Sequence, residues 1–231
     1  MKLPHLLPGR LIRRYKRFLA DVLLDSGETV TAHCPNSGSM MGCNIPGSRV
    51  FLSVSGNQTR KYPYTWEMVE TNGVWAGINT SLPNRIVHEA ISQGEIPELA
   101  GYKNIRPEVP YGKGSRIDLL LSNGGPDCYV EIKNVTLVEE GRALFPDAVT
   151  TRGQKHLKEL MEVVRSGGRG VIFFLVQRSD AESVSPADAI DPEYGRLLRT
   201  AVAGGVEALA YRAEVTPGEI RLARRLDVVP S

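Results

Sequence analysis

Three ionisable residues lie close together near the middle of the chain, in the stretch RIDLLLSNGGPDCYVEIKN at 116–134. Asp118 interrupts an apolar run, and Glu131 and Lys133 follow beyond a Gly-Gly-Pro-Asp turn. Carboxylates in apolar segments are rarely left without a compensating cation. Two carboxylates and a lysine are groups that hold a hard divalent cation and stabilise charge at a phosphorus atom. The pattern therefore predicts a divalent-metal site for phosphodiester chemistry.

The two segments around this turn are predicted to pair as a β-hairpin. Side chains alternate between the faces of a strand, so Glu131 and Lys133 share one face. A register that sets Asp118 beside Glu131 would bring both carboxylates to one Mg²⁺ or Mn²⁺ ion, with the carbonyl of Ile132 as a third ligand. Lys133 would then orient or activate a water on the metal. Asp118, Glu131 and Lys133 are the candidate catalytic residues.

A plainer interpretation of the same residues exists. An Asp followed by ExK occurs by chance in many sequences, and Glu131 and Lys133 would then be an ordinary ion pair on an edge strand. The residues from Ile117 to Leu121 are apolar apart from Asp118. An exposed face is hard to arrange in such a run, which favours the metal site.

Two flanking segments offer further groups for the site. Glu89, in LPNRIVHEAISQG, is a candidate metal ligand, although a solvated helix glutamate is the commoner situation. Arg152, Gln154 and Lys155, in TTRGQKHLKEL, are candidates for gripping a phosphate together with the free N–H groups of a first helical turn. His156 is either a general base or an ordinary surface histidine.

Charge is spread unevenly, although the net charge is only +2. Residues 1–80 carry nine Lys and Arg against five Asp and Glu, and most of the excess lies in RLIRRYKR. The candidate nucleic-acid-binding residues in this cluster are Arg13, Arg14, Lys16 and Arg17. A basic cluster attracts polyanions because neutralised phosphates release counterions. A solvated basic face without a partner explains the charge equally well.

The first third of the chain is predicted to form a small β-barrel. Its strands are expected at 16–24, 29–35, 49–54, 65–70 and 74–79. Asn72-Gly73, between the last two, is a strong hairpin signal because both residues tolerate positive φ. Five short strands without a long helix are typical of an OB fold, and an SH3-like barrel would give the same pattern.

Helical periodicity begins near Leu82, which predicts two domains, 1–81 and 82–231. Apolar residues recur with helical spacing at 82–94, 150–168 and 191–205. The run GVIFFLVQ is almost wholly apolar, as in a strand buried on both faces. With further strands between and after the helices, this order predicts an α/β (α+β) domain built on a mixed sheet.

Several protein classes are disfavoured by the sequence. No apolar stretch reaches the roughly 18 residues that cross a bilayer, and the basic start lacks a secretory cleavage site, so a cytoplasmic location is expected. The three cysteines include no CxxC pair, which suits a reducing compartment. His33, Cys34 and Cys43 would supply only part of a zinc site, so small buried thiols are the simpler interpretation. Walker, GxGxxG and GxSxG motifs are absent from the sequence.

A set of strings, taken in order, resembles the sugar fermentation stimulation protein A family: PNSGSM, GINTSLPNRIVHEAI, SRIDLLL, YVEIKNVTL, FPDAVTTRGQKHLKEL and GVIFFLVQR. The resemblance spans nearly the whole chain. It implies an N-terminal OB-like barrel followed by a restriction-endonuclease-like domain, similar to PD-(D/E)xK nucleases. The nuclease pattern falls on Asp118, Glu131 and Lys133, with Glu89 as a helix carboxylate.

The resemblance also implies a bacterial or archaeal cytoplasmic protein that binds DNA without sequence preference and is linked to regulation of sugar (maltose) metabolism. We therefore expect a DNA-binding protein with a nuclease-like site for Mg²⁺ or Mn²⁺, and leave open whether it hydrolyses phosphodiesters. The alternatives are a regulatory DNA-binding protein without chemistry, and a metal-dependent enzyme acting on a small phosphorylated metabolite. No membrane partner is expected, and the oligomeric state stays open.

Overall fold

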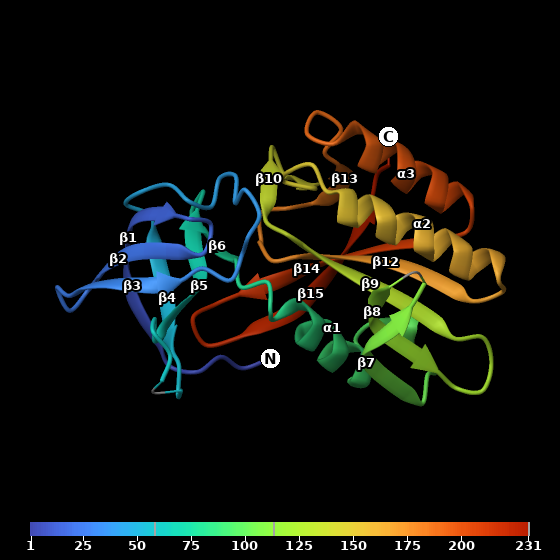
Figure 1. The fold of residues 1–231 in the computed structure, drawn as a ribbon, viewed down its shortest axis with the longest axis horizontal. Helices are drawn as coiled ribbons and strands as arrows, with labels where there is room; N and C mark the ends of the chain where they lie inside the picture. The colour runs from blue at the N-terminus through green and yellow to red at the C-terminus, as the bar shows by residue number, and fades with distance from the viewer. Residues whose placement is uncertain (58, 113, 231) are drawn as a thin grey trace.

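The computed structural model describes residues 1–57, 59–112 and 114–230. These residues form two β-sheets, a six-stranded sheet from the first third of the chain and a nine-stranded sheet from the rest. The two sheets lie next to each other along the long axis of the molecule (Figure 1). Among the described residues, no helix combines the length and apolar character needed to span a membrane.

The first sheet closes into a barrel. Its strands are β1 (Leu6–Tyr15), β2 (Leu19–Leu24), β3 (Thr29–His33), β4 (Arg49–Val54), β5 (Tyr64–Thr71) and β6 (Val74–Gly77). The strand order is β3-β2-β1-β4-β5-β6, and a short parallel pairing of β3 with β5 closes the first five strands. The predicted OB-like barrel is therefore confirmed, with β6 added to β5 outside the closed ring.

One barrel strand, β1, was not predicted. It runs through the basic cluster, where Pro8, Gly9 and several arginines hide the alternation of buried and exposed residues. The strand passes very close to β2: a Cβ atom on Gly9 would lie 2.7 Å from the carbonyl oxygen of Leu23. β1 pairs with both β2 and β4, so it is the strand that joins the two halves of the barrel.

Apolar side chains fill the barrel. Leu11, Leu52 and Trp66 are fully buried, and the indole N–H of Trp66 donates a 3.0 Å hydrogen bond to the carbonyl oxygen of Met68. Burial of each such side chain contributes about 1.5–3 kcal/mol of stability. Trp66 is therefore core rather than a surface for stacking bases.

The second sheet is mixed, as predicted. After α1 (Pro83–Ser92) and the short 3₁₀ helix η1 (Pro97–Leu99), its elements are β7 (Asn104–Tyr111), β8 (Ser115–Ser122), β9 (Cys128–Val135), β10 (Leu137–Glu139), β11 (Arg142–Phe145), α2 (Thr151–Arg165), β12 (Arg169–Val176), β13 (Ser183–Pro186), α3 (Pro192–Ala203), β14 (Glu207–Val215) and β15 (Ile220–Val228). The strand order is β10-β11-β13-β15-β14-β12-β9-β8-β7. β12 pairs in parallel with β9 and β14, whereas β8 and β9 are antiparallel.

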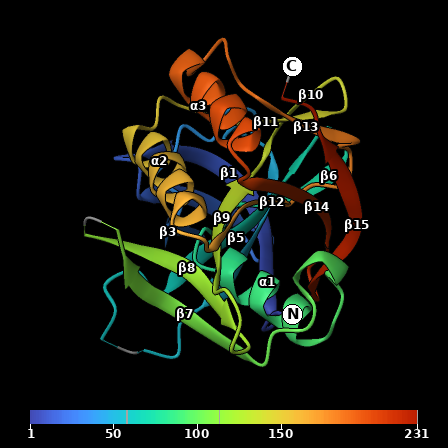
Figure 2. The ribbon, with the colours of Figure 1, turned by 90° about the vertical axis from the view of Figure 1, so that its right-hand side faces the viewer.

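Helices cover the two faces of this sheet (Figure 2). The alternation along β12 sends Phe173 toward α1, and Ile172 and Phe174 toward α2 and α3. Both faces of β12 are thus buried, as its apolar run predicts. All three predicted helices are present.

The barrel and the second sheet share part of their packing. Leu6 and Met68 of the barrel belong to the same buried cluster as α1. The start of the chain also pairs with the turn before β15, where Lys2 forms a bridge with Glu219. The domain boundary at 81/82 stays a prediction.

Candidate metal and nucleic-acid site

A cavity of about 460 Å³ lies between the barrel and the second sheet. Its walls combine residues of the segment after β3, the start of α1, strands β7, β8, β9 and β11, and the start of α2. The residues that line it include Asn36, Ser37, Gly38, Asn84, Glu108, Asp118, Glu131, Ile132, Lys133, Asp147, Arg152 and His156. The three candidate catalytic residues therefore face one cavity, although they come from two strands.

The hairpin register places Asp118 next to the middle of β9. Leu119 pairs with Val130, and continuing this register sets Asp118 opposite Glu131. The Asp118 carboxylate accepts the N–H of Ile132 at 2.7 Å and the side-chain amide of Asn84 at 2.9 Å. One hydrogen bond therefore comes from the neighbouring strand and the other from the start of α1.

A kink in β7 opens space beside Asp118. The pairing of β7 with β8 skips Glu108 and Asp118, and Glu108 has a positive φ of 53°. Arg116 stabilises the kink by donating to the carbonyl oxygen of Glu108 at 2.8 Å. Through this kink the Glu108 carboxylate also reaches the amide of Asn84, at 3.2 Å.

Glu131 is held by cationic and imidazole groups. One carboxylate oxygen, Oε1, accepts from Lys133 Nζ at 2.6 Å and contacts Nδ1 of His156. The other oxygen, Oε2, is buried and has no hydrogen-bond partner among the residues that the structure describes. The Glu131 side chain is only 3% exposed. A buried acceptor without a donor is costly, and it marks a position where another atom is expected.

His156 connects Glu131 to the surface. Its ring is buried, and Nε2 accepts from Nε of Arg152 at 3.4 Å. If Arg152 donates to Nε2, a neutral ring would carry its proton on Nδ1, which contacts Glu131 and lies 3.3 Å from Lys133 Nζ. The ring thus fixes the orientation of the carboxylate from behind.

The environment separates the proton affinities of the two carboxyl groups. Burial first, and then the negative charge of Glu131, raise the pKa of Asp118 to about 6, although the hydrogen bonds from Ile132 and Asn84 and the charge of Lys133 oppose this rise. Burial also pushes up the pKa of Glu131, but the hydrogen bonds from His156 and Lys133 outweigh it and hold that pKa below its ordinary value. The two carboxyl groups that face this cavity therefore differ in pKa, because Glu131 has hydrogen bonds from Lys133 and His156, whereas Asp118 has them from a backbone N–H and an amide.

Comparison with known proteins identifies the chain's relatives. The model of the SfsA N-terminal OB domain matches residues 12–78, and that of the sugar fermentation stimulation protein RE domain matches residues 81–219. The chain is 71% identical to the sugar fermentation stimulation protein homolog of Pelobacter propionicus, over 99% of this chain and all of that protein. It belongs to the sugar fermentation stimulation protein family. The homolog from Geobacter metallireducens is 69% identical over 99% of the chain and 100% of its own length.

A solved member of the family has the same fold. The structure of SfsA from Pyrococcus furiosus, in complex with Ca²⁺, superimposes with a TM-score of 0.92 at 30% identity. The match covers 99% of this chain and 98% of that one. The OB-like barrel and the mixed sheet are thus present in both proteins of the sugar fermentation stimulation protein family.

In this chain, some of the predicted site residues lie away from the cavity that Asp118 and Glu131 line. Glu89 does not line it; its carboxylate lies 3.4 Å from the amino group of Met1. Gln154 donates to Asp191, the N-cap of α3, at 3.0 Å. Lys155 pairs with Glu159 and lines a separate cavity of about 1050 Å³ beside α2. Of the predicted phosphate-binding group, Arg152 alone reaches the carboxylates' cavity.

The larger cavity beside α2 contains none of the candidate catalytic residues. Its lining combines the aromatic rings of Tyr111 and Tyr129 with acidic and basic side chains of α2. The smaller cavity is the candidate site because the buried carboxylates open into it.

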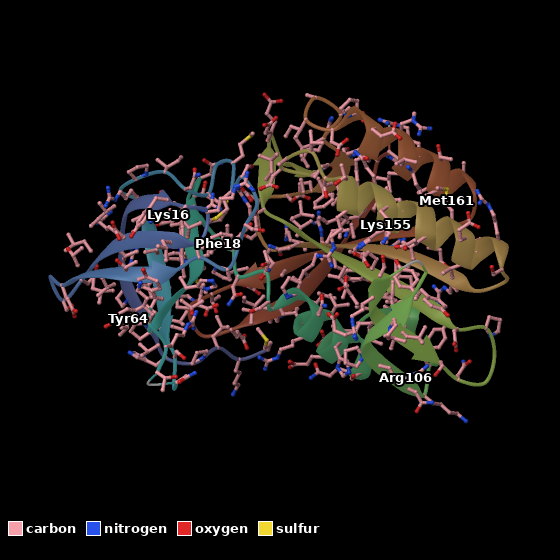
Figure 3. The ribbon with its side chains drawn as sticks, in the orientation of Figure 1. Lys16, Phe18, Tyr64, Arg106, Lys155 and Met161 are labelled. Atoms are coloured by element: carbon pink, nitrogen blue, oxygen red, sulfur yellow. The ribbon has the colours of Figure 1, made fainter. Side chains whose placement is uncertain are left out.

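The predicted basic cluster divides into two kinds of residue. Arg13 pairs with Asp21 at 2.9 Å, and the Arg14 guanidinium binds backbone carbonyls, so neither is simply available to a ligand. Lys16 and Arg17 are exposed in the turn between β1 and β2, and no ion pair involves them in the described part of the chain. Lys16 and Phe18 lie on the barrel, and Lys155 lies on α2 (Figure 3).

The sequence did not predict several polar groups of the cavity, among them Glu108, Asn84 and Asp147. Glu108 lies in a strand that was not predicted, Asn84 was taken only as a helix start, and Asp147 follows β11. Pro107 and Pro110 on either side of Glu108 hid the strand, since proline is uncommon inside sheets. His156 had no local signal that separates a buried histidine from a surface one.

The cysteines are small buried thiols, as the simpler of the two interpretations of the sequence predicts. Cys34, Cys43 and Cys128 are buried and free, and Cys34 Sγ lies 3.5 Å from Sδ of Met40. Across residues 1–57, 59–112 and 114–230, no three His, Cys, Asp or Glu side chains form a group that could hold a metal by themselves. Any metal at Asp118 and Glu131 therefore needs backbone, water or substrate oxygens as well.

Proposed function

We propose that this protein binds DNA without sequence preference and hydrolyses phosphodiesters with Mg²⁺ or Mn²⁺ at the Asp118–Glu131 cavity. The observation that carries the proposal is the buried, unpartnered Oε2 of Glu131 beside a second carboxylate whose pKa is raised to about 6. Both features are those of a pair of acidic groups arranged for a cation. Burial alone would favour apolar residues at these positions.

The donor set fits a hard divalent ion. Mg²⁺ is commonly held by one or two carboxylates, with water and phosphate oxygens completing its shell. Asp118 and Glu131 would supply the carboxylates, and the carbonyl of Ile132 is our candidate for a third protein ligand. When bound, such an ion polarises a phosphoryl oxygen and makes water a better nucleophile at neutral pH. The solved relative from Pyrococcus furiosus was obtained with Ca²⁺, another hard divalent ion.

The chain's own cations act on the substrate. Lys133 holds its ammonium group at the cavity with a side chain that is 12% exposed, so its charge is weakly screened. We assign it the stabilisation of negative charge on the phosphoryl oxygens. Arg152 lines the same cavity and is suited to a phosphate oxygen, because its guanidinium makes directional charge-assisted hydrogen bonds.

Cleavage assays test the catalytic part of this proposal. DNA incubated with the wild-type protein and Mn²⁺ or Mg²⁺ is expected to be cut, and chelation with EDTA is expected to stop it. Glu131→Gln keeps the size of the side chain but removes its charge, and should abolish cleavage. Uncut DNA with every metal, or equal cutting by the Glu131→Gln variant, would refute the catalytic role.

DNA binding without cleavage would instead support a regulatory protein with a nuclease-like fold. The family name links these proteins to sugar fermentation, and non-specific DNA binding in the cytoplasm is the route by which we propose that this member acts on sugar metabolism. Binding through Lys and Arg predicts a steep fall of affinity with salt.

A second function is favoured by the size of the cavity. A volume of about 460 Å³ falls within the range of small-molecule sites, roughly 300–1,000 Å³. A metal-dependent enzyme acting on a small phosphorylated metabolite would release inorganic phosphate from sugar phosphates and would bind DNA weakly, with little salt dependence. DNA cleavage and phosphate release from sugar phosphates are measured on the same preparation. The ratio of the two rates decides between the nuclease and the metabolite-directed enzyme.

A further inference from the structure

The barrel supplies one wall of the candidate site. Asn36, Ser37 and Gly38, from the segment that follows β3, line the cavity opposite the carboxylates' sheet. The segment after β3 extends from the barrel toward β10 (Figure 1). We refer to residues 36–38 as the barrel wall.

Hydrogen bonds tie the residues on both sides of the barrel wall to the loop after β11 and to the segment before α1. Just after the wall, Ser39 Oγ donates to the carbonyl oxygen of Asp147 at 2.6 Å, and the N–H of Met40 donates to its carboxylate at 2.9 Å. Just before it, the carbonyl oxygen of Pro35 accepts from Thr80 at 2.8 Å. A Cβ atom on Gly38 would lie 3.0 Å from an Asp147 oxygen, so the wall has little room to move inward.

Arg14 holds the wall in shape from the barrel side. Its guanidinium donates to the carbonyl oxygens of Asn36 at 2.8 Å, Gly38 at 2.9 Å and Ser39 at 3.3 Å. The same group donates to the carbonyl oxygen of Arg17 at 3.0 Å. One side chain therefore joins the barrel wall to the turn between β1 and β2.

That turn presents the features of a single-strand contact. Phe18 exposes 53% of its surface, and the neighbouring Lys16 and Arg17 are exposed cations. Phe18 is also tied to the chain just before the wall, because its carbonyl oxygen accepts the N–H of Cys34 at 2.7 Å. Exposed aromatic rings stack on unpaired bases, and cations beside them follow the phosphates.

The depth of the site limits which nucleic acid can reach it. Glu131 lines the same cavity as the wall, and its side chain is only 3% exposed. A duplex carries its phosphates on a stiff, wide surface that cannot enter such a cavity, whereas a single strand bends and can be threaded into it.

We infer that the barrel wall selects single-stranded polynucleotide, which stacks a base on Phe18, places its phosphates at Lys16 and Arg17, and passes the wall into the cavity. This inference rests on the proposed function. It adds the form of the substrate and assigns Arg14 a positioning role rather than a direct contact with nucleic acid.

Binding without cleavage tests the inference directly. Fluorescence anisotropy in EDTA compares a labelled single strand of about 20 nucleotides, longer than the roughly 4–16 that an OB fold covers, with the same sequence as a blunt duplex. The single strand is expected to bind at least tenfold more tightly. Phe18→Ala should lower single-strand affinity about tenfold and leave duplex affinity unchanged. Ile12→Ala, another exposed apolar residue of the barrel, is the matched control and should change neither.

A second variant tests the wall itself. Arg14→Lys keeps the charge but cannot reach four carbonyls at once, and it should reduce the single-strand preference at least threefold. Its melting temperature is measured in parallel. An unchanged preference in a folded Arg14→Lys protein, or equal binding of both DNA forms by the wild type, would overturn the inference. If neither form binds, the proposed function itself fails; if both bind equally, only the selection of single strands fails.

Discussion

Replacing Asp118 with asparagine should stabilise the protein at neutral pH. Asp118 lies in a largely apolar strand, and burial together with the charge of Glu131 raises its pKa from 3.8 to about 6. The folded protein therefore ionises this group less readily than the unfolded chain does. Asparagine has nearly the same shape and carries no charge to be desolvated.

The size of the effect follows from the same pKa. Raising the pKa from 3.8 to about 6 corresponds to a cost of about 3 kcal/mol for the ionised form, since each tenfold change in proton affinity is worth about 1.4 kcal/mol. Asparagine has only one acceptor oxygen for the two donors, Ile132 N–H and Asn84, so it loses a hydrogen bond worth about 1 kcal/mol. We expect a net stabilisation of about 2 kcal/mol at pH 8.

The stabilisation depends on pH with a definite sign. Between about pH 4 and 6 the folded protein keeps the Asp118 proton that the unfolded chain releases, so the stability of the wild type falls as pH rises through this window. Above it the full cost of ionisation is present, and below it the neutral carboxyl group resembles asparagine. Urea unfolding of both proteins in EDTA, from pH 4.5 to 8, should show a difference that grows with pH.

The control variant is Asp25→Asn, at an exposed position after β2. It should leave stability nearly unchanged at every pH. Mn²⁺ is expected to raise the free energy of unfolding of the wild type by an amount that grows with the logarithm of its concentration relative to Kd. It should stabilise Asp118→Asn much less. A variant that is less stable than the wild type at pH 8 without metal, or a difference that does not vary with pH, would contradict the electrostatic reasoning.

Three further predictions concern the support of the site and the core. His156→Ala removes a hydrogen bond from the buried Glu131 and should weaken Mn²⁺ binding about tenfold or more in calorimetric titration. His156→Gln should recover part of the affinity. Equal Mn²⁺ affinity in the wild type and both variants would contradict a positioning role for His156. Phe173→Ala empties a fully buried position at the centre of the second sheet and should lower the free energy of unfolding by about 3–5 kcal/mol in urea. Gly9→Ala introduces a Cβ atom 2.7 Å from the Leu23 carbonyl oxygen and should destabilise the barrel by about 1–3 kcal/mol, measured by thermal unfolding.

Local sequence patterns predicted the elements whose burial is regular. The helical spacing around Leu157 and Leu160 and the apolar run of β12 both correspond to buried faces in the structure. β1 and β7 were missed because their prolines, glycine and charged residues interrupt the period of two. Such strands are held by their neighbours in the sheet, and a single sequence contains no direct record of those neighbours.

The candidate site was predictable where two segments lie close in the chain. Asp118 and Glu131 are joined by one short turn, so an assumed hairpin register was enough to bring them together. The same cavity is also lined by Asn84 of α1, Glu108 of β7 and His156 of α2. The positions of these residues depend on how the helices and strands pack, which local sequence does not show. Glu89 illustrates the opposite case, because its helix position fits a ligand while its side chain lies at the amino group of Met1.

Charge alone was a poor guide to function in the basic cluster. Arg14 and Lys16 lie two residues apart. Arg14 donates hydrogen bonds to several backbone carbonyl oxygens, whereas Lys16 is exposed. A guanidinium has several N–H donors in a fixed plane, so it can donate to several backbone carbonyl oxygens of a loop at once. A lysine ammonium does this less well. The number of basic residues therefore overstates the surface that remains for a polyanion.

The two carboxylates have different tasks because the chain supports them differently. Lys133 and His156 keep Glu131 ionised within the folded protein, so that carboxylate is prepared before any ion arrives. The donors to Asp118 among the described residues, Ile132 N–H and Asn84, are neutral, and its proton is held until a cation displaces it or the pH rises past about 6. Glu131 therefore provides the fixed anchor of the proposed site, and Asp118 is the carboxylate through which metal binding competes with protons.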